Sequence, residues 1–279
     1  NRGKARLSLG LVEESVKDFN HVLNAHPRDE AALLNRASAM IRLGQRESAL
    51  SDLDRLLMLN QRSVEALVNK AILLLEMHRI EELNETLQQL DVLAPENPQH
   101  IRIKFELAMQ QGRFDQAYKH AAAGKALFPN DMQFTYAMAV VETELNEDAS
   151  ALKRVEILLR QPNHQLGVKP LLLGARLFSK ANCPAEAEKL LLDAYRQDRQ
   201  NVHTNYALGN HYRRLRQWEN ALKHYRLSES NGISSGFVLE ALYVLGRKQE
   251  YLQRHNELLS LGKSTVVAGA VAGHAEVEY

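Results

Sequence analysis

The sequence has a single cysteine, Cys183, among its 279 residues. One cysteine cannot build an internal disulfide framework or a metal site made of several thiolates. Scarce cysteine favours a reducing compartment, so the cytoplasm is the first expectation and the periplasm stays open. The chain begins at Asn1 rather than Met, partway through a first helix, so a longer protein with an N-terminal localisation signal is also open.

Aromatic residues, long apolar runs and an excess of either charge are also rare or absent. One Trp, seven Phe and nine Tyr mean that the core must be built mainly from Leu, Ala and Val. Lys plus Arg number 35 against 34 Asp plus Glu, and this formal net charge of +1 gives no signal for nucleic-acid binding. No run of about 20 apolar residues is present, so no membrane span is predicted.

What the sequence does contain is a repeat of 34 residues, with one step of 36. One set of equivalent, mostly small positions is Ala221, Ala187, Ala151, Ala117, Leu83, Ala49 and Ser15. A second set in the same register is Gly209, Ala175, Ala139, Phe105, Ala71, Ala37 and Gly3. Two independent sets that agree in register indicate seven repeats.

The clearest copy, residues 201–232, consists of two amphipathic helices joined by a short polar turn. Its landmarks are Leu208, Gly209, Tyr212, Ala221 and Tyr225. This pattern resembles the tetratricopeptide repeat, with Asn205 in place of the opening Trp. The resemblance implies an all-α fold, a right-handed α-solenoid of antiparallel helix pairs. It also implies that first helices line a concave face and second helices a convex one.

The register divides the chain into a repeat array over residues 1–263 and a tail over residues 264–279. The units lie near 1–29, 30–63, 64–97, 98–131, 132–167, 168–201 and 202–232, and a divergent cap spans 233–263. No low-complexity linker interrupts the array, so one continuous superhelix of fifteen or sixteen helices without strands is expected. The tail is expected to be a last packed helix or the start of a following domain.

The resemblance also implies which residues contact a partner, since family members bind ligands through set positions of each first helix. Carried onto this sequence, these positions predict a partner-binding groove. Its residues are Leu34, Asn35, Ile41, Val68, Asn69, Ile72, Leu75, Arg102, Glu106, Tyr136, Arg176, Lys180, His203, Tyr206, Asn210, Arg213 and Arg214.

The groove is predicted to be apolar at its N-terminal end and basic from Lys169 to Arg214, where its positions hold no acidic residue. The predicted partner is a protein or peptide with apolar anchors and an acidic or phosphorylated stretch. The alternative is that these Lys and Arg residues only solubilise the surface. Members that bind chaperone tails clamp a carboxylate with Lys and Arg beside two Asn. Asn35 and Asn69 are present without those basic neighbours, so that ligand is not predicted.

No catalytic residue, metal site or cofactor is predicted. His203, His211 and His224 match no metal-binding spacing, so buried or solvated histidines are expected. Residues 262–264 resemble the end of a phosphate-binding loop, but Glu257 stands where that loop needs glycine. This segment is therefore predicted not to be an enzyme, and a catalytic domain outside it stays open.

The leading hypothesis for function is a protein-interaction scaffold. Two alternatives stay open. The array could be the substrate-recruiting region of a larger enzyme of the sulfotransferase, glycosyltransferase or iron/2-oxoglutarate oxygenase type. It could also be a component of envelope or exopolysaccharide assembly. The full-length reading frame would distinguish the three.

Overall fold

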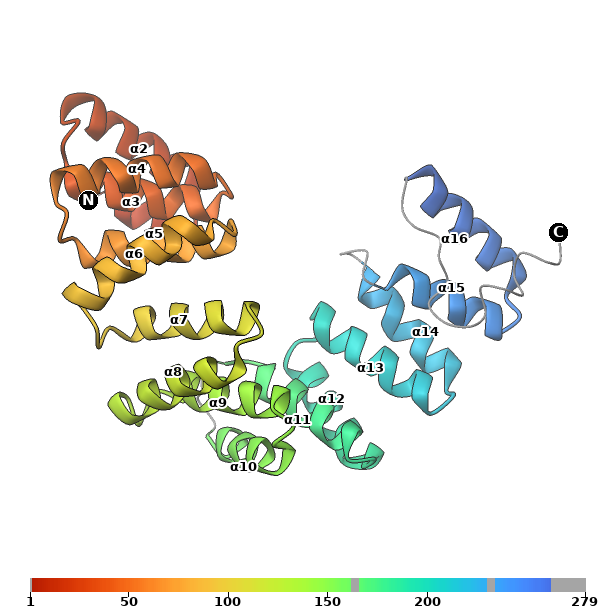
Figure 1. The fold of residues 1–279 in the computed structure, drawn as a ribbon. Coiled ribbons are helices and arrows are strands. Elements are labelled where there is room, and N and C mark those ends of the chain that lie inside the picture. The colour runs from red at the N-terminus through yellow and green to blue at the C-terminus, as the bar shows by residue number, and fades with distance from the viewer. Residues whose placement is uncertain (1, 162–165, 230–233, 262–279) are drawn as a thin grey trace. The chain divides into compact units, whose positions relative to one another are not determined.

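The computed structural model describes residues 2–161, 166–229 and 234–261, and every regular element in these ranges is helical (Figure 1). The predicted all-α fold without strands is confirmed for this part of the chain. The sixteen α-helices described are α1 (Arg2–Ser8), α2 (Val12–Ala25), α3 (Glu30–Arg42), α4 (Arg46–Leu59), α5 (Val64–Glu76), α6 (Ile80–Leu93), α7 (Pro98–Gln110), α8 (Phe114–Leu127), α9 (Met132–Glu144), α10 (Asp148–Leu159), α11 (Lys169–Lys180), α12 (Pro184–Gln197), α13 (Val202–Arg214), α14 (Trp218–Leu227), α15 (Ser235–Val244) and α16 (Lys248–Ser260).

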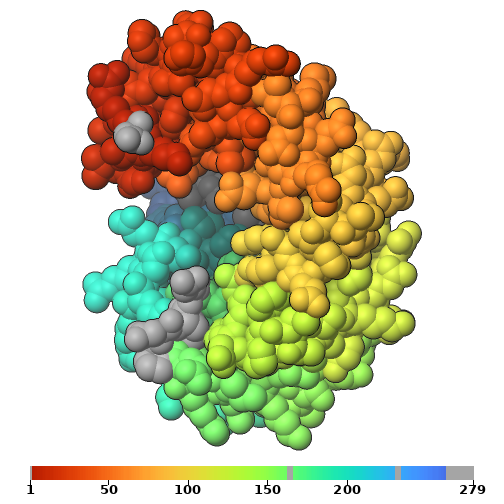
Figure 2. Space-filling view, turned by 90° about the vertical axis from the view of Figure 1, so that its left-hand side faces the viewer, coloured from red at the N-terminus to blue at the C-terminus, as the bar shows by residue number. Residues whose placement is uncertain are grey.

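The chain folds into two compact units, Asn1–Val141 and Glu142–Tyr279, called the N-terminal unit and the C-terminal unit below. Figure 2 shows the repeats of the N-terminal unit following one another in chain order, from red through orange to yellow. A single superhelix over the whole array stays a prediction. The tail expected over residues 264–279 lies outside the described residues.

Within each unit, consecutive helices pack as pairs, as the resemblance implies. A residue with positive φ, between 55° and 79°, joins the helices of each pair. This left-handed residue ends the first helix and directs the next backbone N–H back onto it. In the clearest repeat, the N–H of Gln217 donates to the carbonyl of Tyr212 at 2.9 Å. The equivalent residues are Gly10, Gly44, His78, Gly112, Asn146, Asn182, Arg216 and Gly246.

Small residues lie where the paired helices cross. Ala37, Ala49 and Ala221 are fully buried. A Cβ atom at Gly209 would lie 2.5 Å from the ring of Tyr225, and one at Gly3 would lie 2.9 Å from the equivalent ring of Phe19. These glycines therefore provide the space that an aromatic ring of the second helix fills.

Candidate functional site

The first helices of successive repeats lie closer together than the second helices do. In the N-terminal unit, α5 contacts both α3 and α7, and in the C-terminal unit α11 contacts α13. Among the helices described, no two second helices make comparable contacts. The closer spacing places the first helices, with the predicted site residues, on the inner face of each unit.

On the inner face of the N-terminal unit, an open pocket of about 640 Å³ lies between α3 and α5. Four predicted site residues line it together: Leu34 and Asn35 of α3, and Val68 and Asn69 of α5. Three other predicted residues, Ile41, Ile72 and Leu75, are not among the pocket residues and pack on the hydrophobic core. The structure thus brings together the predicted residues at the N-terminal ends of the two helices.

The pocket also has residues that sequence reasoning missed. Ser63 and Asn97 line it. Each also caps the N-terminus of the helix that follows, because its side chain accepts a hydrogen bond from a backbone N–H of the first turn. With Asp29, they form a set of capping residues spaced by 34 residues. Ser, Asp and Asn are preferred at helix N-termini, so their spacing of 34 residues could have predicted these capping positions from the sequence.

The predicted site residues that follow, on α7 and α9, are mostly held by neighbours. Arg102 donates to Asp131 at 3.3 Å and to Gln133, and its guanidinium lies 5.4 Å from the ring centre of Phe134. Tyr136 is partly buried, and burial raises the pKa of its phenol. Glu106 is exposed. Arg102 is therefore held within the repeat junction by side chains of the next repeat.

In the C-terminal unit, carboxylates pair with three of the cations predicted to make the groove basic. Arg176 contacts Glu144 at 3.0 Å, Lys180 contacts Asp148 at 2.8 Å, and Arg213 contacts Glu240 at 2.9 Å. Each acid comes from the neighbouring repeat. The local positive charge is therefore smaller than the groove positions alone indicated. His203 and Arg214 are exposed, and neither has an ion pair among the described residues.

Tyr206 and Asn210 belong to an aromatic cluster beside these cations. The hydroxyl of Tyr225 donates to Asn210 Oδ1 at 2.8 Å. Tyr206 meets the ring of Phe237 edge-on at 5.7 Å, and the Arg213 guanidinium lies 5.4 Å from the same ring centre. Burial raises the pKa of the Tyr225 phenol. The cluster holds Asn210 and Arg213 in fixed positions on the inner face.

Solved structures share this architecture. A tetratricopeptide repeat protein from Parabacteroides merdae ATCC 43184 matches with a TM-score of 0.63 and 17% identity, over 74% of this chain and 80% of its own. The structure of the APC/C hetero-tetramer Cut9-Hcn1 matches with a TM-score of 0.69 and 14% identity, over 80% of this chain and 45% of the matched one. This chain has the tetratricopeptide repeat fold.

Another structure with this fold is PilW, a type IV pilus biogenesis factor, with a TM-score of 0.63 and 12% identity over 76% of this chain and 97% of PilW. The sequence matches no protein-family model and no curated protein. At these identities, the likeness establishes only the fold of the tetratricopeptide array. The partner has to be inferred from the surface of the array.

Outside the groove, the described part of the tetratricopeptide array contains no group of three or more His, Cys, Asp or Glu arranged to hold a metal ion. His211 and His224 are buried and His203 is exposed, so each falls in one of the two expected classes, buried or solvated.

None of the described helices combines the length and apolar character needed to cross a membrane. Residues 262–264, compared above with a phosphate-binding loop, lie outside the described residues.

His224 belongs to a buried polar network of the C-terminal unit. Its Nδ1–H donates to Asn205 Oδ1 at 2.9 Å, because the Asn205 amide group donates to two backbone carbonyls and leaves its oxygen free to accept. Its ring stacks on Tyr212 and meets Tyr195 edge-on. Asn205, which replaces the opening Trp, therefore fixes a neutral histidine in the core.

This network predicts acid sensitivity. Burial, with a smaller effect of Lys223, lowers the pKa of His224 to about 4. The unfolded chain then binds more protons than the folded chain between about pH 6.5 and about pH 4, so stability falls as pH falls through this window. The expected contribution of His224 to this loss is about 3 kcal/mol. Urea unfolding across the window should show a shallower pH dependence for His224→Gln, and an unchanged slope would contradict the assignment.

Proposed function

We propose that this tetratricopeptide array is a protein-interaction scaffold that binds a peptide segment of a partner on the inner face of the N-terminal unit. The observation that carries the proposal is the pocket between α3 and α5, where groove positions of two successive repeats meet. A pocket shared by equivalent positions of neighbouring repeats suits a segment that runs across the helices.

The chemistry of the pocket favours main-chain recognition with an apolar anchor. Asn35 and Asn69 are equivalent residues 34 positions apart. The Asn35 amide donates to the carbonyl of Ala31, so its side-chain oxygen can still accept, and Asn69 makes no hydrogen bond among the described residues. Both can pair with peptide N–H and C=O groups. Leu34 and Val68 beside them provide apolar contact for one side chain of the ligand.

The proposal also includes an acidic or phosphorylated stretch of the partner that binds at the C-terminal unit. The exposed Arg214 supports it, because it has no ion pair among the described residues. Arg213 contributes less, since Glu240 neutralises it through three hydrogen bonds from its guanidinium, at 2.9 to 3.1 Å. Attraction by Arg214 would act mainly on the association rate and would weaken with salt.

A displayed library of random short peptides, panned on the whole chain, tests the proposed site. Peptides that bind the α3–α5 pocket should lose about tenfold in affinity for Asn69→Leu, because one main-chain hydrogen bond is lost. Asn84→Leu is the matched control, an exposed asparagine of α6 outside this pocket. If no enriched peptide distinguishes the two variants, the proposed site is wrong.

A further inference from the structure

We propose a second docking surface on the opposite side of the N-terminal unit, in the groove between α4 and α6. Its ligand is an extended peptide segment that carries an apolar anchor, a basic residue toward one end and an acidic residue toward the other. This surface is lined mainly by the second helices α4 and α6, with a smaller part from α5, and shares no lining residue with the α3–α5 pocket. It is therefore independent of the inner face.

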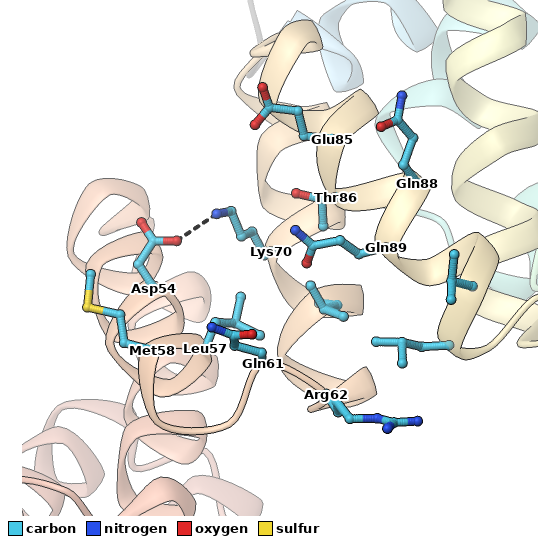
Figure 3. A pocket seen from close by; sticks show the side chains of 13 residues that line it. Asp54, Leu57, Met58, Gln61, Arg62, Lys70, Glu85, Thr86, Gln88 and Gln89 are labelled. Atoms are coloured by element: carbon cyan, nitrogen blue, oxygen red, sulfur yellow. Dashed lines mark hydrogen bonds and ion pairs between the residues drawn. The ribbon is translucent and has the colours of Figure 1, made fainter.

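The groove exists because α4 and α6 diverge. Each packs on α5, and the two do not contact each other to a similar extent. The space between them is a pocket of about 980 Å³, with Leu67 and Lys70 of α5 among its lining residues. Figure 3 shows Met58 of α4 on one side, Gln88 and Gln89 of α6 on the other, and Lys70 between them.

Two exposed apolar side chains flank this groove. Met58 is 80% exposed and Val92 is 83% exposed, higher fractions than for any other large apolar residue described. They occupy equivalent positions of successive repeats, where the preceding and following repeats have Asn24 and Ala126. Large exposed apolar side chains at these equivalent positions thus occur in neighbouring repeats only at this groove. A surface that only contacts water has no need for two such side chains in neighbouring repeats, so the pair indicates a binding surface.

The polar lining indicates an extended ligand rather than a helix. The side chains of Gln61, Gln88 and Gln89 line the groove and make no hydrogen bond among the described residues. Amide groups can donate to and accept from a peptide main chain. A helix satisfies its main-chain groups internally, whereas an extended segment presents them to its binding site.

The charges of the groove determine which side chains fit. Lys70 is paired with Asp54 at 2.7 Å, so these two charges are matched within the protein. Glu85 and Arg62 lie at opposite ends of the view in Figure 3, and neither has an ion pair among the described residues. Glu85 precedes Val92 by seven residues, about 10 Å along α6. An extended ligand covers that length in about three residues. If its apolar anchor contacts Val92 and its basic residue pairs with Glu85, the two ligand residues are therefore about three positions apart.

The test uses the same displayed peptide library, selected on the whole chain and compared on variants. Peptides that bind the groove should carry Lys or Arg about three residues from an apolar residue, and Val92→Glu should weaken them by about tenfold or more. Ile157→Glu is the matched control, an exposed apolar residue of a second helix in the C-terminal unit, and should leave affinity unchanged within about twofold. Glu85→Lys should shift the selected residue from basic to acidic.

Three outcomes overturn the proposal. The first is equal binding to Val92→Glu and Ile157→Glu. The second is a bound peptide that is helical by circular dichroism or NMR. The third is self-association of the chain that Val92→Glu abolishes, which would make a second copy the occupant. A peptide whose binding is lost in Asn69→Leu but not in Val92→Glu reports on the α3–α5 pocket. The two proposals therefore have separate tests, and one can fail without the other.

Discussion

Replacing Asp52 with alanine is expected to lower the free energy of unfolding of the N-terminal unit by about 3 to 5 kcal/mol. Asp52 is buried, and its two carboxylate oxygens each accept a hydrogen bond from Arg36 at 2.6 Å. The Arg36 side chain is only 15% exposed, and its one other hydrogen bond to a side chain among the described residues goes to the amide oxygen Oδ1 of Asn20. The alanine variant would leave this guanidinium buried without a counter-charge, which costs far more than a lost surface contact.

A nearby pair provides the control. Asp54 lies two residues further along α4 and pairs with Lys70 at 2.7 Å, but its side chain is 41% exposed. Asp54→Ala should cost about 1 kcal/mol or less, because solvent already screens the pair. Urea unfolding measures both variants. Equal losses would show that burial does not determine the strength of the Arg36–Asp52 pair, and replacing both partners with leucine should recover much of the stability.

Replacing Gly209 with leucine is expected to destabilise the C-terminal unit by about 3 kcal/mol through overpacking. The Cβ atom alone would lie 2.5 Å from the ring of Tyr225, which is fully buried and held by its hydrogen bond to Asn210. The ring has no space to move into, so α13 and α14 must separate.

Thermal and urea unfolding test the helix crossing at Gly209. Ala185→Leu adds a similar side chain at an exposed position of α12 and should change stability by about 0.5 kcal/mol or less. A second variant, Gly209→Ala combined with Tyr225→Leu, removes the ring that causes the clash and should be more stable than Gly209→Ala alone. A Gly209→Leu variant as stable as the wild type would contradict the crossing geometry.

The fold could be predicted because its determinants recur at short, regular spacings. Gly209, Ala221 and the turn glycines each act within a single helix pair, so the sequence interval is enough to place them. His78 and Arg216 adopt the same positive φ without being glycine, because the repeat geometry requires it at that point.

The candidate site could be predicted only in part. Leu34, Asn35, Val68 and Asn69 meet because they occupy fixed positions on neighbouring first helices. The partners of the cations were missed, because Glu144, Asp148 and Glu240 lie 27 to 32 residues away and reach the cations through packing between repeats. Sequence positions within the groove give no information on such contacts.

Hydrogen–deuterium exchange of the whole chain, with and without a peptide selected for sensitivity to Asn69→Leu, tests the central claim most directly. The peptide should slow exchange in residues 30–38 and 63–69, the segments at the starts of α3 and α5 that contain most of the pocket residues. Protection confined to the second helices of the C-terminal unit, residues 186–196 or 219–226, would contradict inner-face binding and leave only the tetratricopeptide repeat fold established.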